Sequence, residues 1–184
     1  MPTEHTESHD CKRISDLIDH DDVRDVLGRF ACEYKPSMSA KKFLSYFPFG
    51  LESHAFKGNA IGKSIGFGSK SSKVVYCGHG AVFSAMATVA AMLASGIEIE
   101  EVSQVTDNSA RVLGNVPSSI WHFEGKIEAS LTGENTQTSI EIVTVYPGQI
   151  MAWGAGARLI RRIEQRLEEA AVELAGCESL RCYR

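Results

Sequence analysis

The amino-acid sequence predicts an α+β fold in which an antiparallel meander of four to five strands packs on a long C-terminal helix. Residues 120–131 alternate between apolar and polar side chains, which is the period of a strand with one face against a core. Residues 80–95 and 154–174 instead carry apolar side chains at helical spacing. Turn-forming residues separate these segments, so the order is one strand, one helix, further strands and a closing helix.

The elements follow one another closely. Residues 73–77 form a short predicted strand, and the helix over 80–95 ends at Gly96. Residues 97–105 and 110–116 are the next two strands, joined by a turn at 107–109. Residues 120–131 and 136–146 complete the meander before the long helix, which ends at Gly176.

The domain organisation predicted from composition has five parts. Residues 1–12 are a disordered tail, and 13–57 are a helical extension with helices over about 14–30 and 39–47. Residues 58–72 are rich in Gly, Ser and Lys, which is typical of a linker or loop. The α+β domain covers 73–176, and 177–184 are a second tail.

Composition excludes several classes of function. A formal charge of −4 gives no reason to expect a nucleic-acid partner, and no metal or other cofactor is indicated. The five cysteines are scattered and the N-terminus resembles no targeting signal, so a reduced, cytoplasmic protein is expected. Residues 74–97 contain no charged side chain over 24 positions. Their Ala-rich middle and glycines predict a strand followed by a buried helix rather than a membrane span.

One local pattern carries a family resemblance. The strand Ser119–Ile127 reads SIWHFEGKI, a second strand covers 138–145, and Trp153-Gly154 opens the last helix. In this arrangement residues 73–174 resemble a shortened helix-grip fold of the START-like superfamily, whose members bind lipids, hormones and polyketides. The meander is shorter than the usual six strands. Folds of the TATA-box-binding-protein, longin and profilin types use similar pieces and remain open.

The resemblance implies a groove for an apolar or amphipathic ligand between the sheet and the C-terminal helix. Apolar side chains on the strand and on the helix would line such a groove. The candidate ligand-binding residues are Trp121, Phe123, Ile127, Trp153, Leu159 and Ile163. The alternative is that these side chains fill the core and leave no space.

Other patterns indicate chemistry only weakly. Residues 58–64 (GNAIGKS) resemble a phosphate-binding loop but have three residues between the glycines, where the motif requires four. Cys77 and His79 could form a nucleophile and base, although a half-buried thiol beside a helix start is the simpler interpretation. No His, Cys or Asp spacing matches a zinc site.

Four arginines share one face of the last helix and could meet an anion, but glutamates interleave with them. A solvated, salt-bridged face is therefore expected. These arginines are Arg158, Arg161, Arg162 and Arg166.

The sequence is compatible with three functions. The first is a non-catalytic binding protein for a small apolar or amphipathic ligand. The second is a protein-protein interaction or scaffolding module acting through its helices, with a homo-oligomer as one form of partner. The third is a cyclase- or hydrolase-like enzyme using His79 or His122, which lacks a paired acid and base in the sequence.

Overall fold

A computed structural model describes residues 14–33, 68–118, 124–134, 137–148 and 154–183. Two N-terminal helices precede the sheet, one helix lies between its first two strands, and a long helix and a short 3-10 helix close the chain. In order they are α1 (Ile14–Ile18), α2 (Asp21–Glu33), β1 (Gly68–Cys77), α5 (Ala81–Ala94), β2 (Glu98–Thr106), β3 (Ser109–Val116), β4 (Gly125–Glu134), β5 (Gln137–Pro147), α6 (Ala155–Leu174) and η1 (Glu178–Tyr183).

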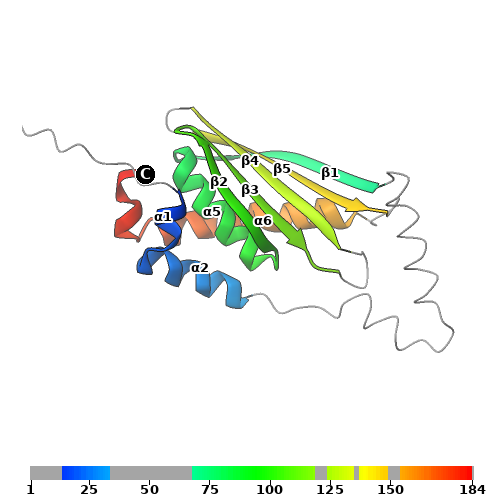
Figure 1. Ribbon diagram of the computed structural model, residues 1–184, viewed down its shortest axis with the longest axis horizontal. Helices are drawn as coiled ribbons and strands as arrows, with labels where there is room; N and C mark the ends of the chain where they lie inside the picture. Colours follow the sequence, from blue (N-terminus) through cyan, green and yellow to red (C-terminus); the bar gives the residue numbers. More distant parts are fainter. Residues whose placement is uncertain (1–13, 34–67, 119–123, 135–136, 149–153, 184) are drawn as a thin grey trace, which may run out of the picture.

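The strands form one antiparallel sheet in the order β1-β5-β4-β3-β2. Strands β2 to β5 are a meander, and β1 pairs with the last strand of that meander. The labelled helices all lie beneath one face of the sheet, and its other face is open (Figure 1). The predicted α+β class, with a five-stranded antiparallel meander and a long C-terminal helix, is confirmed.

The alternation in the sequence explains which face of the sheet is covered. Strand β4 buries Ile127, Ala129 and Leu131, and β5 buries the residues paired with them, including Ile142. Glu128 and Glu141 point to the open face. Because neighbouring residues of a strand face opposite sides, a period of two places one continuous apolar layer against the helices.

Helix α5 is the centre of the covered layer. Thirteen of its residues are buried, and Gly96 with φ 81° ends the turn that follows it. The expected strand followed by a buried helix is therefore confirmed for residues 74–97. None of the helices in the described ranges combines the length and apolar character that a membrane crossing requires.

Strand β1 begins earlier than predicted. Residues 68–72 were expected in the linker because they are small and polar, yet they pair with 143–147 of β5 in the same unbroken register as the rest of β1. Backbone hydrogen bonding to a long neighbouring strand supports extended structure there despite weak local propensity. The linker prediction is wrong for this part, and the predicted helix over 39–47 lies outside the described residues.

Residues 177–184 were expected to be a tail, which is also a wrong prediction. Leu180 and Cys177 are buried, and η1 lies beside α1 and α2 at the far end of the chain (Figure 1). The Asp22 carboxylate accepts hydrogen bonds from the Ser179 backbone N–H at 3.1 Å and from the Ser179 hydroxyl. One carboxylate near the start of α2 thus fastens the C-terminal segment to the N-terminal helices.

Candidate interaction surface

The structure places three of the predicted ligand-binding residues in the covered layer. Ile127 points from β4 toward the helices, while Leu159 and Ile163 point inward from α6, and all three are buried. The other three lie outside the described residues: Trp121, Phe123 and Trp153. The three described side chains belong to one hydrophobic cluster that also contains most of α5.

Two glycines beside that cluster are closely packed. A Cβ on Gly114 would lie 2.5 Å from a methyl of Ile97, and one on Gly125 would lie 2.6 Å from the Tyr146 ring. Real Cβ atoms do not approach other atoms this closely, so these positions are filled to contact. In the described part, side chains occupy the layer that a ligand groove would need.

The first turn of α6 packs closely against the sheet. Gly156 lies over β1 and β5, where an added Cβ would meet the hydroxyl oxygens of Thr144 and Ser71. Thr144 is fully buried, and its hydroxyl has no hydrogen-bond partner within the described residues. Beside it, burial raises the pKa of Tyr146 to about 12, with Arg158 acting in the opposite direction.

Cys77 and His79 lie at the end of β1 without the geometry of a catalytic pair. Cys77 is buried, and the His79 ring lies 4.3 Å from the ring of Phe83. The His79 carbonyl oxygen accepts hydrogen bonds from Ser84 at 3.1 Å and Thr138 at 2.7 Å. His79 therefore contributes its backbone, which fastens the start of α5 to β5.

No cluster of three or more His, Cys, Asp or Glu side chains with metal-binding geometry occurs in the portion of the chain that the structure describes. Cys177 is buried with its Sγ 3.5 Å from the backbone oxygen of Asp22, whereas Cys182 is exposed. The tail histidines and the loop over 58–64 lie outside the described ranges.

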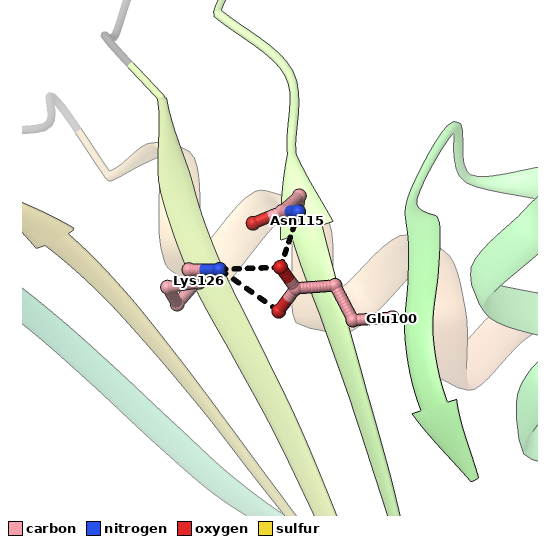
Figure 2. Close-up of polar contacts among 3 residues, drawn as sticks. All are labelled: Glu100, Asn115 and Lys126. Carbon is pink, nitrogen blue, oxygen red and sulfur yellow. Dashed lines mark hydrogen bonds and ion pairs between the residues drawn. The ribbon is translucent and has the colours of Figure 1, made fainter.

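The open face of the sheet carries ion pairs that cross its strands. Figure 2 shows the Glu100 carboxylate of β2 between Lys126 of β4, at 2.7 and 2.8 Å, and Asn115 of β3, at 2.7 Å. Hydrogen bonds from Lys126 and then Asn115 hold the pKa of Glu100 below its usual range. These groups are exposed, so they position strands more than they stabilise the fold.

A second ion pair lies along the same face. Arg111 of β3 donates to Glu128 of β4 at 2.7 Å, and this hydrogen bond lowers the pKa of the Glu128 carboxyl. With its charged groups paired to one another, this part of the face resembles an ordinary solvated surface.

Two exposed apolar side chains lie elsewhere, on the edge strand β1. Val74 is 46% exposed and Tyr76 is 66% exposed, both on the open face of β1. Val172 of α6 is 76% exposed. The remaining large apolar side chain that is well exposed in the described ranges, Val105, lies on the opposite edge strand, β2.

Helix α6 has two distinct flanks. One faces β1, where Lys73 contacts Glu164 at 2.5 Å. The other faces α2, where Arg166 contacts Glu33 at 3.1 Å, and Glu173 of α6 binds Arg29. Of the four arginines on this helix, Arg166 therefore takes part in a salt-bridge network, as expected.

Comparisons with known proteins give no identification: no family model matches the chain, and searches of curated proteins and of solved structures found no significant match.

The sequence analysis did not predict two of the polar contacts described above. The group around Glu100 joins three strands, and the contact between Asp22 and Ser179 joins the two ends of the chain. Neither has a local signal, because the partners are far apart in sequence. The exposed side chains of β1 did have a local signal, because Val74 and Tyr76 alternate with Val75 and Cys77 in a strand that the sequence predicts.

Proposed function

We propose that this chain is a non-catalytic binding module whose ligand is another protein chain, held at the surface formed by β1 and the adjacent flank of α6. The observation that supports this is the exposure of Val74 and Tyr76 on β1, which forms one edge of the sheet among the described residues. Exposed apolar groups beside unpaired strand edges are typical of sites where a second chain adds.

The filled core also favours a surface function over a buried groove. Helix α5 packs against the covered face of the sheet, and the inward-facing Ile127, Leu159 and Ile163 are buried in the same cluster. Helix α5 offers little surface for a partner, because it is buried along almost its whole length.

Chemical cross-linking in the source cells would test the protein-partner proposal. Lys70 and Lys73 of β1 should cross-link to a partner chain, and Tyr76→Asp should abolish those links. Val105→Asp is the matched control, because Val105 is 64% exposed on the opposite edge strand. Links that survive Tyr76→Asp, or that form only through Lys126 of the open face, would contradict the proposal.

A second candidate is the small apolar or amphipathic ligand that the helix-grip resemblance implies. The observation that favours it is the buried Thr144 hydroxyl without a described partner, beside Ser71 and the first turn of α6. An unsatisfied buried hydroxyl is costly, and a ligand headgroup could satisfy it.

Native mass spectrometry of protein purified from its own cells would test this second candidate. A bound lipid-sized adduct is expected for the unmodified chain and not for Thr144→Val, which keeps the shape and removes the hydroxyl. Thr138→Val serves as the control, because the Thr138 hydroxyl already donates to a backbone carbonyl. If no adduct forms and added oleic acid leaves the melting temperature unchanged, the ligand is excluded.

A further inference from the structure

The two edges of the sheet are built differently. Strand β2 has register shifts between Ile99 and Glu101 and between Gln104 and Thr106, and it carries several glutamates. Bulges and charges are devices that prevent another strand from pairing with an edge. The β2 edge is protected against a further strand.

Strand β1 has fewer of these protections, and its charged residues are Lys70 and Lys73. Its residues pair with β5 without a register shift from Gly68 to Cys77, and it contains neither a proline nor an acidic residue. Val74 and Tyr76 are exposed on it. A long and regular edge strand that has no second pairing strand among the described residues is suited to receive another strand through its backbone groups.

The charges of α6 run against its own dipole. Arginines occupy its first half, whereas its second half is mostly acidic, and it has no acidic residue in the first turn and no basic residue in the last. A helix dipole favours the reverse order. An antiparallel partner helix would oppose the dipoles and bring each arginine-rich half against an acidic half.

The flank of α6 that faces β1 is complementary to itself in that arrangement. It contains Ala157, Arg161, Glu164, Glu168 and Val172, which helical spacing places along one line. A two-fold axis near Glu164 sets Arg161 opposite the partner's Glu168 and Ala157 opposite the partner's Val172. The two Glu164 carboxylates then lie close to the axis, where each keeps Lys73 as its ion-pair partner. Arg161 and Glu168 are exposed, and neither makes an ion pair within the described ranges.

We infer that the protein partner is a second copy of this chain, joined through antiparallel pairing of the two β1 edges, with the two α6 helices side by side and antiparallel. This inference rests on the proposed function and names its partner. The two sheets become one continuous sheet with all helices on the same side.

The symmetry also limits the registers that the pairing can have. A two-fold axis perpendicular to the sheet pairs only residues that point to the same face. A register centred on Val74 places Val74 against its own copy and Ser72 opposite the partner's Tyr76. This pairing places the two exposed apolar side chains of β1 beside side chains of the partner strand and opposes no charged residue of the strand to itself.

Analytical ultracentrifugation of the full chain over a range of concentrations tests the inference, and a dimer is expected. Arg161→Glu and Glu168→Arg should each raise the dissociation constant by at least about tenfold, since each places like charges together twice across the axis. Mixing these two variants should restore a dimer, because opposite charges then face one another. The double variant in one chain should do the same.

Two control substitutions show whether loss of the dimer is specific to the β1 edge or is a general effect of changing charge. Arg162→Glu reverses an exposed charge away from the β1 flank, and Val105→Asp alters the other edge. Both should leave the dimer intact, whereas Val74→Asp should yield a monomer. Circular dichroism of each variant confirms that a monomer is folded.

Two outcomes would overturn the inference. One is a monomer for the unmodified chain at every accessible concentration, and the other is a dimer that Val105→Asp breaks and the α6 charge reversals do not. If the chain is monomeric while Tyr76→Asp still removes cross-links to another protein, only the inference fails. If those links are absent too, the proposed function fails with it.

Discussion

Gly156 shows how a single residue sets the distance between a helix and the sheet. An added Cβ would meet the Thr144 hydroxyl and lie 2.7 Å from the Ser71 hydroxyl, so α6 would have to move outward. We expect Gly156→Ala to lower the free energy of unfolding by about 1 to 3 kcal/mol through overpacking. Urea denaturation measures this change.

Gly28 is the control for that substitution. It lies within α2 with no atom within 4 Å of an added Cβ, so Gly28→Ala should stabilise the protein by up to about 1 kcal/mol. Equal destabilisation by both substitutions would show that contact with Thr144 and Ser71 is not the cause.

Asp22 makes stability depend on pH. Burial raises its pKa, but hydrogen bonds from Ser179 and the Val23 backbone N–H outweigh burial, so the pKa of the carboxyl lies below its usual value. Because its pKa is depressed in the folded state, the carboxylate stabilises the fold at pH values above the unfolded-state pKa, which is about 4. That contribution disappears as the pH falls through the folded-state value.

The substitution Asp22→Asn should therefore lower the free energy of unfolding by about 1 to 3 kcal/mol at pH 7. The difference from the unmodified protein should shrink as the pH falls below about 4. Asp21→Asn provides the comparison, because Asp21 forms only an exposed pair with Arg24 and should change stability by less than about 1 kcal/mol. A difference that is constant with pH would rule out the Asp22 charge as its origin.

At the scale of elements, helix α5 decides whether the covered layer is solid. Ala87 is fully buried in it. We expect Ala87→Leu to lower the free energy of unfolding by about 1 to 3 kcal/mol, because packed cores do not accept added volume. Ala31→Leu, at an exposed position of α2, should have almost no effect. Tolerance at Ala87 would reveal spare volume and favour the small-ligand candidate.

Elements with a clear apolar period were predicted closely. The strong stripe of α6 and the alternation in β4 and β5 mark both their kind and the face that each buries, because burial selects apolar residues at those positions. The first half of β1 has no such period, since Ser, Lys and Gly there lie at an edge and are held by pairing with β5. The short η1 is likewise held by contacts that no local pattern shows.

The whole molecule could be predicted only where local pattern and tertiary contact agree. The class and order of the fold followed from the sequence. Ile127, Leu159 and Ile163 lie in the buried cluster between sheet and helices, but whether such residues line a space depends on how α5 packs against them, which the sequence does not show. The joining of the two chain ends through Asp22 and Ser179 depends on the folded arrangement alone.

This joining predicts that the N-terminal helices and the sheet unfold together. Phe30 of α2 is buried in the same cluster as α5 and the sheet, so Phe30→Ala should lower the free energy of unfolding by about 3 to 5 kcal/mol. In a two-state transition every probe reports the same change. In Phe30→Ala, the protection of amides against hydrogen exchange should therefore fall equally in α2 and in β4. Cys32→Ala, at an exposed position, should change the protection of neither element. A loss of protection in α2 that leaves β4 unchanged would mean that the helical extension folds as a separate unit, because only an independent core would keep the sheet at its original stability.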